Sequence, residues 1–172
     1  MSQLLVSPLS SLALTLETHR PSRLVTLLSP LHMIPSPKGF DRRTHLQLAV
    51  DDVNDPLAAD FPPAREHVDR LIAFAREWEA DAPLLIHCWA GISRSMASAF
   101  IILCDRLGPE REMEIAQAMR RRAPHANPNM LLVRHADALL GREGRMVAAL
   151  RMMGPPRVMV EGIPTAFPLV GL

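Results

Sequence analysis

The sequence predicts an α/β fold in which a central, mostly parallel sheet of about four to five strands is flanked by helices and followed by a helical C-terminal half. Two observations predict it. Up to residue 108, short apolar runs of strand length alternate with stretches whose apolar residues recur at helical spacing. From residue 110 to residue 153 only helical spacing occurs, interrupted by Pro124, Pro128 and Gly141.

The composition agrees with a single soluble domain. The chain has 172 residues, is 48% hydrophobic and carries a net charge of +1, which allows one hydrophobic core but is short for two domains. We therefore predict one domain over residues 1–153. Residues 154–172 contain four prolines and no periodicity, so we expect an extended C-terminal tail there.

Composition also narrows the expected partners. Lys38 is the only lysine, so a broad basic surface for nucleic acid is not expected. No run of about 18 apolar residues occurs, so we expect no membrane span. The two cysteines, Cys88 and Cys104, cannot build a disulfide framework, and no spacing of Cys or His fits a closed zinc site. The expected location is the reducing cytoplasm.

The first half of the chain supplies three of the expected strands. Strands are predicted at residues 3–7, 24–28 and 46–50, and helices at residues 10–18 and 64–78. The second helix has its apolar residues on one face and arginine and glutamate on the other. The apolar N-terminal run has no lysine or arginine before it, so we assign it to the first strand and helix rather than to a signal peptide.

The centre of the chain contains a strand, a loop and a buried helix in succession. The run PLLIH, residues 83–87, is continuous and apolar, which is typical of a strand buried on both faces of a parallel sheet. Residues 94–108 are apolar on nearly all sides and end at a glycine, which predicts a buried helix. Three further helices are expected at residues 110–122, 130–140 and 142–153.

The loop of residues 88–94 combines groups that can hold an oxyanion. Where the chain turns from strand into helix, backbone NH groups can form a concave nest that attracts anions. Gly91 permits a positive φ, and Arg94 offers two donors to a phosphate or sulfate. The same positive field favours the thiolate of Cys88, which is the nucleophilic form. An anion cradle and a nucleophile therefore coincide, which suits attack of sulfur on phosphorus.

These residues carry a resemblance to a known family. The stretch HCWAGISRS, residues 87–95, resembles the His-Cys-five residues-Arg-Ser/Thr signature of the protein tyrosine phosphatase superfamily, and AGISRS is most similar to the dual-specificity branch. The order of elements is similar over residues 3–140. The resemblance implies a dual-specificity-phosphatase-like fold for the catalytic domain. It also implies a metal-independent phosphomonoester hydrolase, a protein tyrosine or dual-specificity phosphatase, that forms a phosphocysteine intermediate.

The resemblance also implies a role for each residue of the signature. Cys88 would be the nucleophile, and Arg94 would clamp the phosphate. Ser95 would ease departure of the thiolate in the second step, and His87 would support the loop by hydrogen bonding. The phosphate-binding positions would be Trp89, Ala90, Gly91, Ile92, Ser93 and Arg94.

The general acid is expected outside the signature. In the family it is an aspartate on a mobile loop that precedes the cysteine, and it serves as acid in the first step and as base in the second. In LAVDDVNDP, residues 48–56, Asp52 follows the strand in a way similar to the dual-specificity pattern. Asp51 and Asp55 remain alternatives.

The expected substrate is a phosphorylated protein, phosphotyrosine first, or a small phosphomonoester, hydrolysed without a cofactor or a metal. Positions 89–93 contain no lysine, whereas phosphoinositide-directed relatives often carry basic residues there, so an inositol substrate is disfavoured. Two other classes stay open. One is a catalytically weak phosphate-binding module, a pseudophosphatase. The other is a rhodanese-like sulfurtransferase, although its active loops usually have a different spacing.

Structural roles are expected for several other polar residues. Cys104, inside the buried helix, is assigned to the core. Asn129, which follows a proline, is expected to cap the helix at residues 130–140. The positive charges of the arginines at residues 120–122 are expected to complement the dipole at the C-terminal end of a helix. His125 is expected to be a surface or structural residue.

Overall fold

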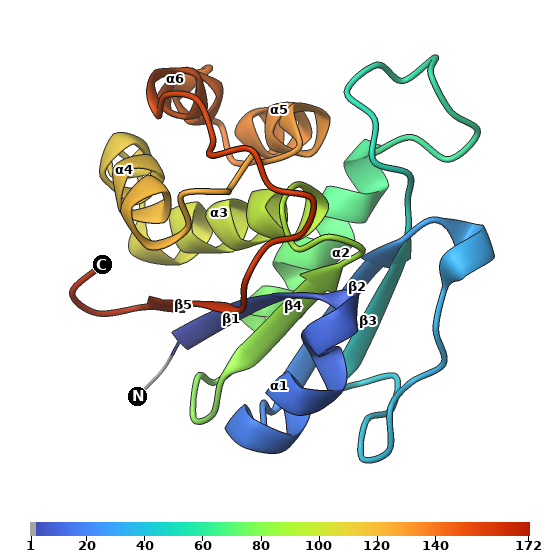
Figure 1. The fold of residues 1–172 in the computed structure, drawn as a ribbon. Helices are drawn as coiled ribbons and strands as arrows, with labels where there is room; N and C mark the ends of the chain where they lie inside the picture. The colour runs from blue at the N-terminus through green and yellow to red at the C-terminus, as the bar shows by residue number, and fades with distance from the viewer. Residues whose placement is uncertain (1–2) are drawn as a thin grey trace.

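The computed structural model describes residues 3–172. A five-stranded sheet in the order β3-β2-β4-β1-β5 lies at the centre of the molecule (Figure 1). The strands are β1 (Gln3–Pro8), β2 (Arg23–Leu28), β3 (His45–Ala49), β4 (Leu84–Cys88) and β5 (Thr165–Pro168). The first four are parallel and β5 is antiparallel to β1, which confirms the predicted mostly parallel sheet.

Helices cover both faces of the sheet. Helix α1 lies on one face, and the other helices lie on the opposite face (Figure 1). They are α1 (Leu12–His19), α2 (Arg65–Arg76), α3 (Arg94–Leu107), α4 (Glu112–Arg122), α5 (Met130–Leu139) and α6 (Arg145–Met152). Among residues 3–172, no helix is long and apolar enough to span a bilayer.

The bounds of the predicted helices differ most at the start of α6, which begins at Arg145 instead of residue 142. Asp137 accounts for this difference. Its carboxylate accepts hydrogen bonds from the backbone nitrogens of Gly144 (2.6 Å) and Met146 (2.8 Å), and so satisfies groups that a helix leaves free at its start. Gly144 has a φ of +85°, a conformation that glycine adopts without steric cost.

Side-chain alternation along the strands divides the core into two layers. Leu5, Leu24 and Leu85 form a small cluster with Leu12 of α1. Their strand neighbours, such as Ile86, belong to the larger core on the other face. Because successive side chains of a strand point to opposite faces, the continuous apolar runs of β1, β2 and β4 are buried on both sides.

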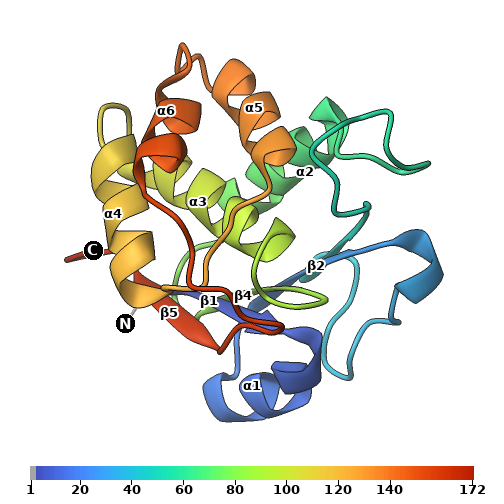
Figure 2. The ribbon, with the colours of Figure 1, turned by 45° about the horizontal axis from the view of Figure 1, so that its top comes forward.

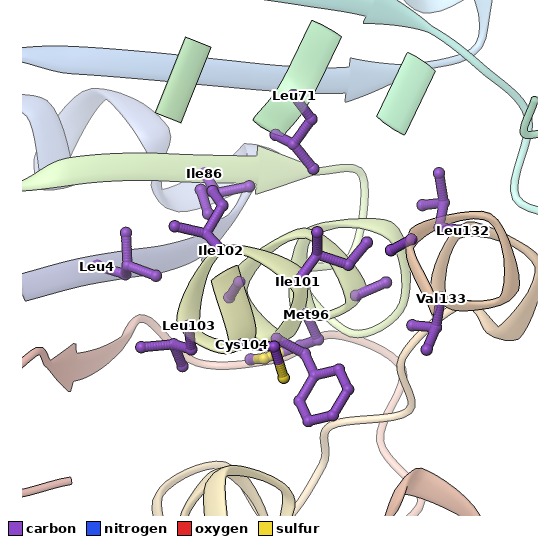
Figure 3. Close-up of a cluster of buried hydrophobic side chains, with 14 of the residues drawn as sticks. Leu4, Leu71, Ile86, Met96, Ile101, Ile102, Leu103, Cys104, Leu132 and Val133 are labelled. Carbon is purple, nitrogen blue, oxygen red and sulfur yellow. The ribbon is translucent and has the colours of Figure 1, made fainter. Parts of the chain in front are cut away.

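Helix α3 passes through the larger core, and its side chains from Arg94 to Cys104 are all buried. Figure 3 shows Ile102 of this helix near β4, with Leu71 and Leu132 contributed by α2 and α5. Cys104 lies in the same apolar cluster (Figure 3), which confirms its assignment to the core. Burial raises the pKa of its thiol, so this cysteine stays protonated and unreactive.

The C-terminal segment packs against the sheet. Residues 154–172, for which the sequence predicts an extended tail, run from α6 back to the sheet and add β5 beside β1 (Figure 2). Phe167 of β5 is fully buried. Arg120 holds the start of the segment through a hydrogen bond of 3.0 Å from its Nη2 to the carbonyl oxygen of Gly154. The strand is missed in the sequence because four residues between prolines show no pattern, and pairing with β1 decides its conformation.

The register of the parallel strands brings their carboxyl ends to one edge. Cys88 is paired with Pro8, and His87 is paired with Thr26. On the other side of β2, Leu28 is paired with Ala49, the last residue of β3. The loops that follow β1, β2, β3 and β4 therefore meet at the edge where parallel sheets bind ligands.

Candidate active site

The loop of residues 88–94, here called the cysteine loop, is fixed from its outer side. Its carbonyl oxygens accept hydrogen bonds from three other segments of the chain. The bonds join Leu9 N to Trp89 O (3.1 Å), Gly162 N to Ala90 O (2.8 Å), Asn127 N to Ile92 O (2.9 Å) and Asn129 N to Ser93 O (3.2 Å). With these carbonyls turned outward, the NH side of the loop is available to an anion, as expected of a nest.

Gly91 is needed at the tip of this turn for two reasons. Its φ is +68°, and a Cβ atom at this position would lie 2.7 Å from the backbone nitrogen of Pro8. An L side chain would therefore be strained and would also collide with the end of β1. Any other residue would push the loop away from the sheet.

Cys88 and Ser95 meet where the two ends of the cysteine loop come together. The Sγ atom of Cys88 lies 3.1 Å from the Oγ atom of Ser95, and both side chains are buried. Cys88 is the last residue of β4, and Ser95 lies in the first turn of α3. A hydroxyl that donates to sulfur stabilises a thiolate, because hydrogen bonds to ionised acceptors are the stronger ones.

His87 is held by the neighbouring strand. Its Nε2 lies 2.7 Å from the Oγ1 of Thr26, and the same hydroxyl lies 2.8 Å from the Nε2 of His45. A hydroxyl has one proton to donate, so it donates to one ring and accepts from the other. Burial, together with nearby His45 and Arg94, lowers the pKa of His87 to about 4, so the ring is neutral at pH 7. Thr26 was not identified in the sequence because a threonine inside an apolar strand has no distinguishing pattern.

Arg94 is the first residue of α3 and is buried with part of its hydrogen-bonding capacity unused. Its Nη1 donates to the carbonyl oxygen of Val50 at 2.8 Å. Within the described residues, its Nε has no hydrogen-bond partner. The carboxylate of Asp52 lies 3.7 Å from this atom, too far for a hydrogen bond. A buried guanidinium donor without a partner is costly, and an oxyanion held by the loop would satisfy it.

The three candidate aspartates lie in different surroundings. Asp52 contacts the cysteine loop: its Oδ1 accepts a hydrogen bond of 2.6 Å from the hydroxyl of Ser93. Asp51 instead accepts from the backbone nitrogen of Phe61, and Asp55 accepts from the backbone nitrogen of Leu57. The structure therefore brings Asp52 to Arg94 and Ser93, while the other two carboxylates stabilise turns within their own loop.

Comparison with known proteins gives matches in structure and none in sequence. No protein-family model matches the chain, and no curated protein sequence matches it. The structure of DUSP15 has a TM-score of 0.57 at 17% identity, and the match covers 89% of each chain. The Yvh1 phosphatase domain from Chaetomium thermophilum also has a TM-score of 0.57, at 22% identity over 83% of this chain and 93% of that one. A complex of PTPMT1 with PI(5)P has the same TM-score at 15% identity, over 83% and 96%.

The chain has the protein tyrosine phosphatase fold. The neighbours are protein tyrosine and dual-specificity phosphatases, so the fold implied by the signature is confirmed. At these identities the likeness concerns the fold alone. The function must be argued from the site itself.

A small pocket opens beside the cysteine loop of this phosphatase fold. It has a volume of about 210 Å³ and is lined by Leu28, Ser29, His32, Trp89 and Arg94. Trp89 is 54% exposed, and its ring meets that of His32 edge to face at a centroid distance of 5.2 Å. Arg94 thus forms the polar end of a pocket whose rim is aromatic.

Asn129 is a site residue whose position the sequence could not give. It caps α5, as predicted, by accepting a hydrogen bond of 3.0 Å from the backbone nitrogen of Leu132. Its Nδ2 also donates to the Oδ1 of Asp52 (2.9 Å) and to the carbonyl oxygen of Val53 (3.0 Å). The helix cap was a local signal, but the contact with Asp52 spans 77 positions of the sequence.

Three other structural points complete the surroundings of the site. His125 is buried, which supports a structural role for it rather than a surface one. A Cβ atom at Gly162 would lie 2.7 Å from the His125 ring and 2.9 Å from the carbonyl oxygen of Gly91. Over residues 3–172, no three histidine, cysteine, aspartate or glutamate side chains are grouped so that they could hold a metal ion.

Proposed function

We propose that this protein is a phosphomonoester hydrolase that works through a phosphocysteine intermediate, with phosphotyrosine as its first candidate substrate. The observation that carries the proposal is the meeting of four groups around one loop. Cys88 contacts Ser95 at 3.1 Å. Among residues 3–172, the buried Nε of Arg94 has no hydrogen-bond partner, and Asp52 lies beside it. A nucleophile, a clamp and a carboxylate are the groups that transfer of one phosphoryl group requires.

In the first step, the thiolate of Cys88 attacks phosphorus and forms an S–P bond. The bond from phosphorus to the ester oxygen breaks, and Asp52 gives its proton to the leaving oxygen. The NH groups of the cysteine loop and Arg94 stabilise the charge on the other phosphate oxygens.

In the second step, water attacks the phosphocysteine and the S–P bond breaks. Asp52, now a carboxylate, takes a proton from the water. The sulfur leaves as a thiolate, which the hydroxyl of Ser95 stabilises. Inorganic phosphate then dissociates, and the starting state of the site is restored.

The aromatic rim of the pocket favours a substrate whose leaving group is aromatic. The exposed ring of Trp89 and the ring of His32 offer surfaces against which the ring of a phosphotyrosine can stack. The structure of PTPMT1 holds PI(5)P, but positions 89–93 of this chain contain no lysine to neutralise additional phosphates. We therefore propose a phosphorylated protein rather than a phosphoinositide as substrate.

The proposal is tested by hydrolysis of 4-nitrophenyl phosphate in the presence of EDTA. The parent protein should hydrolyse this substrate, and the variant Cys88→Ser should be inactive. Cys104→Ser, which changes a core cysteine away from the site, is the matched control and should retain activity. Activity of the Cys88→Ser variant would remove Cys88 from the mechanism, and a parent that binds phosphate without turnover would indicate a binding module.

The general acid is tested by changing Asp51, Asp52 and Asp55 to asparagine one at a time. Because Asp52 contacts the cysteine loop, Asp52→Asn should lower kcat about 100-fold. The other two variants should behave like the parent. A loss confined to Asp51→Asn or Asp55→Asn would reassign the acid.

A further inference from the structure

The two carboxylate oxygens of Asp52 have different surroundings. Oδ1 accepts two hydrogen bonds, one from Ser93 Oγ at 2.6 Å and one from Asn129 Nδ2 at 2.9 Å. Oδ2 lies on the side of Arg94, 3.7 Å from its Nε atom. One oxygen is therefore engaged by the protein, and the other faces the group that would bind phosphate.

Asn129 is well suited to fix this orientation because it is itself immobilised. Its side chain is buried, its Oδ1 accepts from Leu132 N in the first turn of α5, and its Nδ2 also donates to the carbonyl of Val53. Its backbone nitrogen donates to the carbonyl of Ser93. One residue thus joins α5, the cysteine loop and the loop that carries Asp52.

We propose that Asn129 and Ser93 are positioning residues that select the oxygen of Asp52 from which the proton is delivered. This inference rests on the proposed function, in which Asp52 is the general acid. A carboxylic acid carries its proton on one oxygen only. A proton on Oδ1 would face two donors, so the proton belongs on Oδ2, next to the clamp formed by Arg94.

The mechanism makes the consequence measurable. An acid must protonate the leaving oxygen when that oxygen becomes a strongly basic phenolate, and it matters less when the product is the weakly basic 4-nitrophenolate. Misplacing Asp52 should therefore slow hydrolysis of phenyl phosphate far more than hydrolysis of 4-nitrophenyl phosphate. A defect that is only structural would slow both substrates by the same factor.

The experiment compares kcat/KM for these two phosphates in the parent and in Asn129→Ser. Serine keeps a side-chain oxygen to cap α5 but is too short to reach Asp52. We expect kcat/KM for phenyl phosphate to fall about 10-fold or more, and that for 4-nitrophenyl phosphate to fall less than about 3-fold. Ser93→Ala removes the other donor without touching the cap and should shift the ratio in the same direction.

A double variant tests whether Asn129 acts through Asp52. In the Asp52→Asn background, Asn129→Ser should leave the ratio of the two kcat/KM values unchanged, because residues that act through one group are not additive. An equal loss for both substrates in the single variants, or an additive effect in the double variant, would overturn the inference while leaving the proposed function intact. A parent protein that hydrolyses neither phosphate would overturn both.

Discussion

The hydroxyl oxygen of Ser95 lies 3.1 Å from the sulfur of Cys88, and the two side chains are buried together at the junction of β4 and α3. The value of this contact for catalysis would come in the second step, when the S–P bond breaks and negative charge returns to the sulfur. A hydrogen bond to a charged acceptor is worth about 1.5–3 kcal/mol.

Ser95→Ala should therefore slow the second step more than the first. We expect kcat to fall about 10-fold or more, with a rapid burst of 4-nitrophenolate equal to the enzyme concentration before the steady state. Ser98→Ala is the matched control, because Ser98 is buried on the same helix and, within the described residues, its hydroxyl donates to the carbonyl of Arg94 alone. Stopped-flow absorbance measures both phases, and a variant with unchanged kcat and no burst would contradict the role of Ser95.

Gly91→Ala should destabilise the protein and abolish hydrolysis. The new Cβ would meet the backbone of Pro8 at 2.7 Å in addition to the strain of a positive φ. Gly141 has a similar φ of +62°, and apart from its two chain neighbours no described residue has an atom within 4 Å of the position that a Cβ would take there. Gly141→Ala therefore isolates the backbone strain, about 1–2 kcal/mol. Urea unfolding should show a larger loss for Gly91→Ala, and equal losses would mean that the contact with Pro8 is not limiting.

The stability of the fold should decrease as the pH falls from about 6.5 to about 4, in part because of His87. Burial lowers the pKa of this residue to about 4 from its ordinary value of 6.5, so between these values the unfolded chain binds a proton that the folded protein does not. The free energy of unfolding therefore rises with pH across this window, by up to about 3 kcal/mol in total.

Urea unfolding at pH 7.5 and pH 5 measures this effect. His87→Gln cannot titrate, so its free energy of unfolding should depend less on pH than that of the parent. His45, His67 and His125 remain in both proteins, and burial lowers the pKa of each, so the difference between the two slopes belongs to His87. Equal slopes would show that His87 is not buried in the neutral form.

Phe167→Ala should cost about 3–5 kcal/mol of stability, because the ring is fully buried in the core beside β1. Val160→Ala, in the same C-terminal segment but 98% exposed, should change stability by less than about 0.5 kcal/mol. Thermal unfolding of the two variants provides the comparison. Similar melting temperatures for both would mean that the segment after residue 153 adds nothing to the domain.

The fold could be predicted from the sequence where the pattern is local and long enough. The continuous apolar run of β4 and the apolar helix α3 lie within a few residues of their predicted bounds, because both are buried on nearly all sides. Strand β5 could not be predicted in this way. It has four residues, and its conformation depends on an edge of β1 that lies far away in the sequence.

In the candidate site too, some residues could be predicted from a local pattern and others could not. Residues 87–95 contain the cysteine, the glycine turn, the arginine and the serine in one continuous stretch, so the sequence alone determined this constellation and the chemistry that it favours. Which aspartate faces it, and the contacts of Thr26 and Asn129, were decided only by the tertiary structure. These residues come from other elements: Asp52 is 41 positions from Ser93 and 77 from Asn129. The register of the parallel strands and the packing of α5 bring them together, and no local pattern in the sequence encodes those distances.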